Sequence, residues 1–261
     1  MIDFEKAKNT FNRYVEKFDK NDSRVDRKIR HTYLVVEASE YLSRALKLSE
    51  EDAELSKLIA LLHDIGRFKQ SEIKEKNYDQ IEENFDHAEY GVNLLFKDNF
   101  IREFIEESQY DEIIYKAIKN HNKLEIEYGL SEKELLHAKL IRDNDKTGNF
   151  TLKVEEDLKE VYNLKNISEI EYDEISDDTY NSFMSAEVIK RMERKTNLDS
   201  WISLVAFIFD YNFKESLEYI YNNQYINKIF DKISYKNPKT IEKILKMKKF
   251  SLMYIQEQIA K

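Results

Sequence analysis

Apolar residues recur at three- and four-residue steps along most of the chain, the pattern of amphipathic helices. In residues 27–46, for example, one helical face collects His31, Val35, Ala38, Leu42 and Ala45. No segment alternates with period two for long enough to indicate a strand. The pattern therefore predicts helices over residues 27–46, 51–62, from 86 onward, 111–120, 131–142, 201–209, 216–233 and 240–259.

Helix-end signals sharpen some of these boundaries. Asp86 with Glu89, and Ser131 with Glu134, have the spacing of a capping box, in which a short polar residue caps the helix and an acid follows three residues later. Gly66 fits the position after a helix C-terminus, so we expect it to end the helix of residues 51–62.

The connecting segments are polar or acidic. Residues 67–85 are weakly periodic and predict a loop over the surface. Residues 154–180 are acidic and irregular, and Pro238 precedes the last helix. We therefore expect a helical core over residues 1–153, followed by an acidic connection and C-terminal helices over 154–261 that pack on the same domain.

Composition agrees with an all-α fold. Among 261 residues there are only four Gly and one Pro, too few turn residues for a sandwich or a Gly-rich phosphate loop. Hydrophobic residues make up 41%, enough for a sizeable core. The net charge of −9 argues against a double-stranded nucleic acid as partner, because such binding needs a basic surface.

Other classes of protein are excluded by what the sequence lacks. It has no Cys, which rules out disulfides, thiolate metal sites and a cysteine nucleophile. Its longest strongly apolar run, residues 202–209, is far shorter than the ~20 residues of a membrane helix. The first residues also lack the pattern of a secretory signal. We expect a cytoplasmic protein that does not contact a membrane.

Histidine and aspartate residues form the candidate chemical site. They follow the order His31, His63-Asp64, His87, His121 and then Asp143 and Asp145. Imidazole and carboxylate hold Mn, Fe, Co, Ni or Zn without thiolates. Neighbouring helical residues point ~100° apart, so His63 and Asp64 can serve one site only if it straddles them. A carboxylate between two metal ions, with converging helices supplying the other ligands, fits this requirement.

The same residues resemble a known family. His31, His63-Asp64 and Asp145 resemble the H…HD…D signature of the HD superfamily of metal-dependent phosphohydrolases, and residues 58–67, LIALLHDIGR, resemble its central helix and turn. Residues 86–91, DHAEYG, and Asn120-His121 resemble the elements that add two His in the two-metal branches, some of which have a further His at the position of Asn122. The order of all six ligands is similar to that of uncharacterised bacterial members.

This resemblance implies an HD-domain-like helical bundle with an additional C-terminal helical region. Residues 142–146, RDNDK, are similar to a closing motif whose second Asp is the ligand, which selects Asp145 over Asp143. Family members often continue this motif with Leu and Asp, where the chain has Thr147 and Gly148.

The resemblance also implies a ligand set and a reaction. His31, His63, Asp64 and Asp145 would hold one metal, and Asp64, His87 and His121 a second. One or two divalent ions per chain are expected: Mn, Fe, Ni, Co, Zn or Mg. A metal-activated water would cleave a small phosphoester, with nucleotides among the candidates. Arg67 and Lys146 would contact phosphate.

Each assignment has a plainer alternative. His87 and His121 could line the pocket and touch only substrate, and Arg67 and Lys146 could be ordinary helix-end charges facing water. Two other functions stay open: a mixed-valent di-iron oxygenase of the same superfamily, and a nucleotide-binding module without catalysis. The sequence leaves the substrate, the metal and the oligomeric state undecided.

Overall fold

A computed structural model describes residues 2–72 and 85–261, and within these residues it contains helices and no β-strand. The expected all-α fold is therefore confirmed. The chain divides into two compact units, Met1–Gly148 and Asn149–Lys261. This division falls within the long helix α9 (Glu132–Glu155), which also contains residue 153, where the sequence suggested that the helical core ends.

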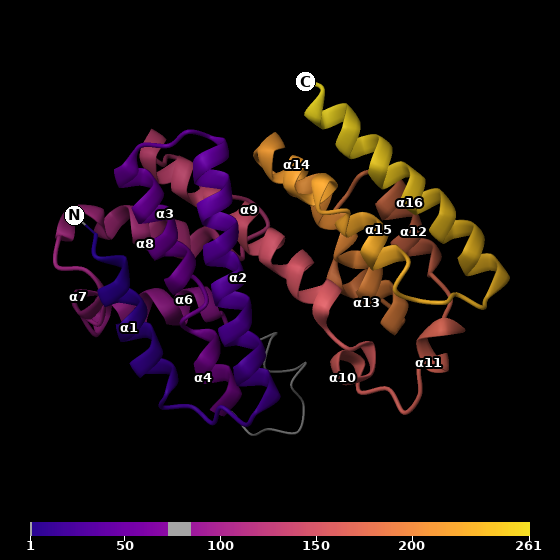
Figure 1. The fold of residues 1–261 in the computed structure, drawn as a ribbon, viewed down its shortest axis with the longest axis horizontal. Helices are drawn as coiled ribbons and strands as arrows, with labels where there is room; N and C mark the ends of the chain where they lie inside the picture. The colour runs from indigo at the N-terminus through magenta and orange to yellow at the C-terminus, as the bar shows by residue number, and fades with distance from the viewer. Residues whose placement is uncertain (1, 73–84) are drawn as a thin grey trace. The chain divides into compact units, whose positions relative to one another are not determined.

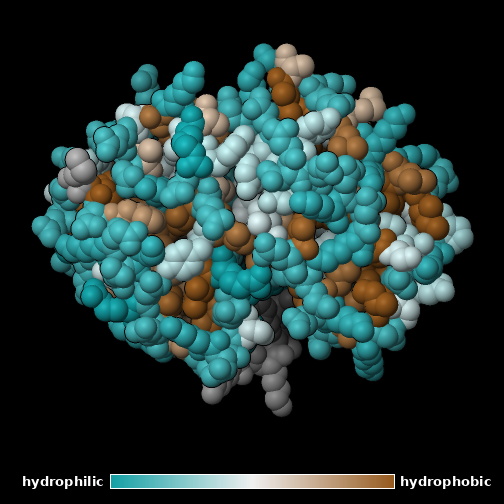
Figure 2. All heavy atoms as spheres, viewed as in Figure 1, coloured by the Kyte–Doolittle hydropathy of each residue, from teal (hydrophilic) through white to brown (hydrophobic). Residues whose placement is uncertain are grey.

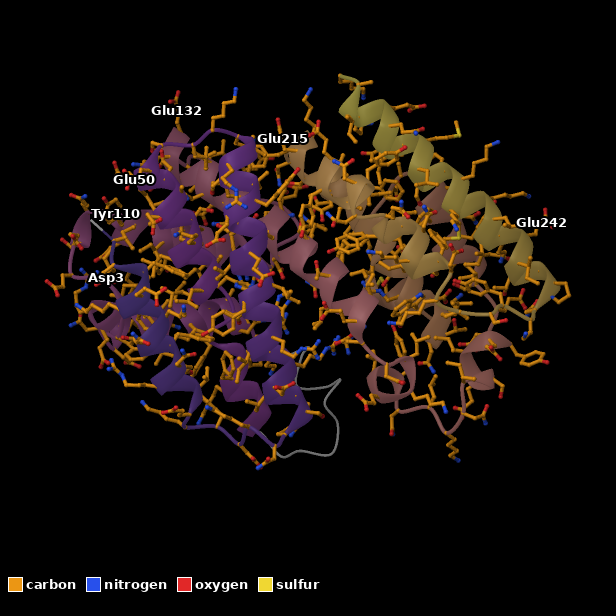
Figure 3. All side chains as sticks on the ribbon, in the orientation of Figure 1. Asp3, Glu50, Tyr110, Glu132, Glu215 and Glu242 are labelled. Carbon is orange, nitrogen blue, oxygen red and sulfur yellow. The ribbon has the colours of Figure 1, made fainter. Side chains whose placement is uncertain are left out.

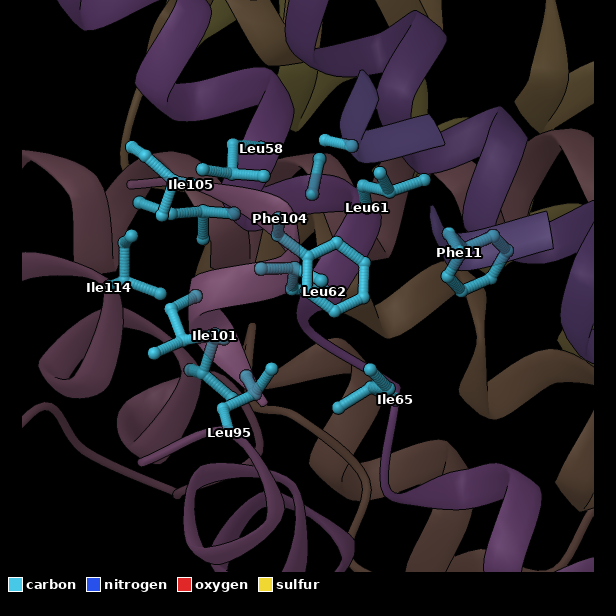
Figure 4. Packing of buried hydrophobic residues seen from close by; sticks show 14 of the residues in the cluster. Phe11, Leu58, Leu61, Leu62, Ile65, Leu95, Ile101, Phe104, Ile105 and Ile114 are labelled. Carbon is cyan, nitrogen blue, oxygen red and sulfur yellow. The ribbon is translucent and has the colours of Figure 1, made fainter. Parts of the chain in front are cut away.

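The first unit is assembled around helix α3 (Glu50–Leu62), which packs against α1 (Phe4–Val15), α2 (Ser23–Ala45) and α8 (Asp111–Asn120) (Figure 1). Ser49 caps α3 by accepting a hydrogen bond from the backbone N–H of Asp52 at 3.1 Å. Nearly every residue in the second half of α3 is buried. Its side chains pack with the residues labelled in Figure 4, among them Phe11, Ile101, Phe104 and Ile114.

Shorter elements complete this unit: α4 (Arg67–Glu72), α6 (His87–Val92), α7 (Ile101–Phe104) and the helical turn η2 (Ser108–Tyr110). After α6 the chain continues as one π-helical turn, η1 (Asn93–Lys97). Asp86 caps α6, as its sequence signal predicts, by accepting from the N–H groups of Ala88 and Glu89.

Two expectations for this unit need correction. Residues 67–72 form helix α4 rather than a loop, and Phe68 in this helix is fully buried; residues 73–84 of the expected loop lie outside the described residues. Helix α3 ends at Leu62, so Gly66 does not terminate it; Gly66 instead lies against the backbone of α6. Helix α1 is an addition, because the sequence pattern gave no prediction for its residues.

The second unit follows with helices α10 to α16. The irregular segment 154–180 includes the short helices α10 (Leu158–Tyr162) and α11 (Ser168–Glu171) and the start of α12 (Asp177–Met184). Next come α13 (Asn197–Ser203), α14 (Lys214–Asn222), α15 (Tyr225–Phe230) and α16 (Pro238–Ile259). The predicted helix over 216–233 is divided because Gln224 adopts φ +56°. Pro238 is the first residue of α16, where its missing N–H costs no hydrogen bond.

Polar side chains cover most of the face shown in Figure 2, interrupted by small apolar areas. Acidic side chains such as Glu50 and Glu132 point outward (Figure 3). Among the helices of the described residues, none combines the length and the hydropathy that a bilayer crossing would require.

Trp201 is the largest fully buried side chain of the second unit. Its indole Nε1–H donates to the carbonyl oxygen of Ile229 at 3.2 Å, and the ammonium groups of Lys153 and Lys232 lie 5.7 and 5.8 Å from its ring centre. This arrangement links α13 to α15 and places two cations near one aromatic ring.

We expect Trp201→Phe to lower the free energy of unfolding by about 1–3 kcal/mol, because it leaves the Ile229 carbonyl without its donor and opens a small cavity. Urea unfolding followed by circular dichroism measures the change. Tyr172→Phe, at an exposed position of the same unit, is the control and should leave the midpoint unchanged. Equal midpoints for all three proteins would show that the indole contact contributes nothing.

Candidate metal centre

The His63-Asp64 turn leads from the end of α3 into α4 and is held by three helices. The imidazole Nδ1 of His63 lies 2.7 Å from the carbonyl oxygen of Ala60, one turn back along α3. From α1, the hydroxyl of Tyr14 donates to the carbonyl of Ile65 at 3.2 Å. From α2, the ammonium of Lys28 donates to the carbonyl of Arg67 at 2.6 Å. The backbone that follows the turn is therefore fixed by contacts from two other helices.

Six donor side chains meet at this turn, in two groups of three. His31 of α2, His63 and Asp145 of α9 form the first group; Asp64, His87 and His121 form the second. Within each group the potential ligand atoms all lie within 4.8 Å of one another. The structure thus brings together His31, His63, Asp64, His87, His121 and Asp145, all of the expected ligands.

Asp64 lies between the two groups. Its Oδ1 is 3.4 Å from the Nε2 atoms of both His87 and His121, whereas its Oδ2 is 3.7 Å from Nε2 of His63. The two oxygens of one carboxylate therefore face different groups. A carboxylate shared between two cations requires this arrangement.

The first group is completed across two helices. Oδ1 of Asp145 lies 2.9 Å from Nε2 of His31 and 3.8 Å from Nε2 of His63. Asp143 does not belong to either group. Gly148 lets α9 come close to α2 here, since a Cβ at this position would lie 2.6 Å from Cγ2 of Val35.

Hydrogen bonds orient two of the imidazole rings. Nδ1 of His63 donates to the carbonyl of Ala60 and Nδ1 of His121 donates to that of Ile118, each at 2.7 Å, so both Nε2 atoms are directed at the cluster. Nε2 of His63 is buried and has no hydrogen-bond partner among the described residues. Metal-binding histidines are oriented in this way, with the second nitrogen donating to a backbone carbonyl.

Protonation states also suit a cation. Burial lowers the pKa of His63 to about 4 and that of His87 to about 3, the latter with help from the positive charge of Arg67. Both rings are therefore neutral near pH 7. Burial raises the pKa of Asp64, but the positive charge of Arg67, joined by that of His63 once its ring is protonated in acid, outweighs this effect and holds that pKa well below its usual value. The residues present thus fit a divalent ion: neutral imidazoles and ionised carboxylates around an unsatisfied buried nitrogen.

The two expected phosphate contacts differ in their setting. The Nε of Arg67 lies 3.1 Å from both oxygens of Asp64, and 30% of its side chain is exposed, so the guanidinium lies at the open edge of the cluster. Lys146 follows Asp145 on α9 and is buried. Its role as a phosphate contact stays a prediction.

Two residues without a prediction from the sequence hold the turn in place. Lys28 precedes His31 by three positions and so shares its helical face, a signal that could have identified it. Tyr14 lies on helix α1, and no local signal relates it to Ile65. His137, the histidine outside the motif, is buried 3.2 Å from Asp52 and takes no part in either group.

The sequence was compared with models of known protein families, with curated proteins and with solved structures. The model of the HD domain family matches residues 29–150, a span that contains all six donors. No curated protein and no solved structure matches the chain. The matched span coincides with the helices that carry the two groups, and the fold is helical, as an HD domain requires. This match supports membership of the chain in the HD-domain superfamily.

Proposed function

We propose that this protein is a metal-dependent phosphohydrolase that holds two divalent cations, one in each group of donors. The observation that carries the proposal is the position of Asp64, whose two oxygens face the two groups. HD domains are generally found in hydrolases. Bound divalent ions would supply Lewis acidity and activate a water for in-line attack on phosphorus.

The chain's own residues prepare the site for this chemistry. His63 and His121 direct their Nε2 atoms at the cluster because backbone carbonyls accept from their Nδ1 atoms. Asp64 and Asp145 supply negative charge that draws cations into a buried place. Arg67 lies beside Asp64 with a partly exposed guanidinium, which suits a second role in orienting a phosphate oxygen.

The substrate in this proposal is a small phosphate ester, with nucleotides among the candidates, and the reaction takes place in the cytoplasm. A partly exposed cation beside an anionic cluster favours a phosphorylated ligand over a neutral one, because the guanidinium can pair with phosphate oxygens. This position of Arg67 favours hydrolysis over the oxygenase alternative.

Protein purified without chelator should contain divalent metal, approaching two ions per chain, and should release phosphate or open a phosphodiester in a panel of substrates. Treatment with EDTA should abolish turnover, and Mn²⁺, Co²⁺, Ni²⁺, Zn²⁺ or Mg²⁺ should restore it to different extents. Elemental analysis measures the bound metal, and phosphate release or loss of the diester substrate measures turnover. Iron at two per chain with oxygen consumption and no hydrolysis would replace the proposal with the oxygenase, and nucleotide binding without turnover would replace it with a binding module.

A further inference from the structure

The two histidines of the second group lie at helix ends that are distant in sequence. His87 is the first residue of α6, and His121 is the residue that caps the C-terminus of α8. Their Nε2 atoms are 3.1 Å apart. The ends of short helices fray readily, so this separation depends on contacts that join the two segments.

Asp86 makes such a contact. Its Oδ1 accepts from the N–H groups of Ala88 at 3.0 Å and Glu89 at 3.2 Å, which caps α6. The same Oδ1 accepts from Nδ2 of Asn122 at 3.0 Å, and Oδ2 pairs with the ammonium of Lys123. One carboxylate therefore caps the helix of His87 and also holds the residues that follow His121.

Arg142 also contacts the turn that follows α8, residues 121–124. This residue of α9 is only 6% exposed, and its guanidinium donates to the backbone carbonyls of Asn120, Lys123 and Leu124. These are carbonyls at and beyond a helix C-terminus, which have no partner within the helix. The carboxylate of Asp86 thus holds side chains of this turn, and the guanidinium of Arg142 holds its backbone carbonyls.

Capping alone does not explain these contacts. Asp3, Asp22 and Asp157 cap their own helices through N–H groups two or three residues further along. Asp86 does the same but also reaches 36 and 37 positions along the chain to Asn122 and Lys123. The extra contacts cross between the two segments that carry His87 and His121, where they can influence a shared ligand.

We infer that Asp86, Asn122, Lys123 and Arg142 are positioning residues, here called the Asp86 brace, that set the distance between His87 and His121 and thereby the affinity of the second ion. The inference rests on the proposed function, because the second group must hold a cation. None of the brace residues is a proposed ligand. Asn122 acts here as a donor to Asp86.

The test of the brace is a calorimetric titration of the metal-free protein with Mn²⁺. Lys123→Met keeps the cap of α6 but removes the ion pair, and it should weaken the second binding step by about tenfold or more while leaving the first step unchanged. Lys123→Arg, which retains the charge, should restore the wild-type value. Asp86→Asn, which retains the capping oxygen, should resemble Lys123→Met. Asp157→Asn is the matched control at a helix cap in the second unit and should bind both ions normally.

The possible failures are distinguishable. If the wild type binds two ions and Lys123→Met binds both with unchanged affinity, the brace is refuted and the proposed function stands. Equal weakening of both steps, or the same loss in Lys123→Arg, would indicate a general structural role and also refute it. If the wild type binds one ion or none, the second site itself is absent, and the two-ion proposal is refuted together with the brace.

Discussion

Replacement of Asp64 by Asn should lower the rate of phosphoester hydrolysis about a thousandfold or more and reduce the bound metal to well under two ions per chain. The two side chains have nearly the same size, so the change removes charge rather than volume. Asp64 is the residue whose oxygens face both groups of donors, and its pKa lies well below the usual value. It is therefore ionised throughout the range of common assays, and the substitution weakens both sites at once.

Asp52→Asn provides a matched control for this loss. Asp52 is also a shielded carboxylate that contacts a buried imidazole, that of His137 at 3.2 Å, but it lies outside both groups. This variant should lose some stability and keep its metal and its rate. Elemental analysis and steady-state kinetics on both variants give the comparison. Full metal content and an unchanged rate in Asp64→Asn would contradict the assignment.

The second large effect is expected from Gly66→Ala. A Cβ at Gly66 would lie 2.2 Å from the carbonyl oxygen of His87 and 2.8 Å from the backbone nitrogen of Gly91. Both neighbours are backbone atoms and cannot rotate away, so α6 must move from the His63-Asp64 turn. We expect the free energy of unfolding to fall by about 3 kcal/mol or more. The shift of His87 away from Asp64 should also abolish binding of the second ion.

Gly129→Ala is the control for the introduction of a methyl group. Gly129 has φ +83°, and a Cβ added there would have no atom within 4 Å, so the substitution costs only backbone strain, about 1–2 kcal/mol. It should leave metal binding unchanged. Thermal unfolding and calorimetry distinguish the two variants. A Gly66→Ala protein as stable as the wild type, with two bound ions, would show that α6 does not need this close approach.

Local signals in the sequence were sufficient for several helices. Residues 111–120 form α8 with the expected bounds, and Asp86 caps α6 as predicted. In both cases the information lies within a few consecutive residues: an apolar period, or a short polar side chain before it. Such signals do not depend on the rest of the fold.

Other elements depend on distant contacts and could not be predicted in this way. Helix α4 is mostly polar in sequence, and Phe68, which is buried, does not by itself create an apolar period. Gly66 resembles a helix-ending glycine, but its role is set by α6, more than twenty positions later. The sequence motif identified the six candidate ligands. The position of Asp64 between the two groups and the contacts of Asp86 follow only from the packing of the helices.

The contact between Gly148 and Val35 has a consequence for how this chain tolerates change. A Cβ at position 148 would lie 2.6 Å from Cγ2 of Val35 and 3.2 Å from its backbone nitrogen. A smaller residue at 35 would remove the nearest obstacle, so the cost of a larger residue at 148 depends on what stands at 35. The two positions are thus epistatic, and we expect a side chain at 148 to be tolerated better when the residue at 35 is smaller than valine.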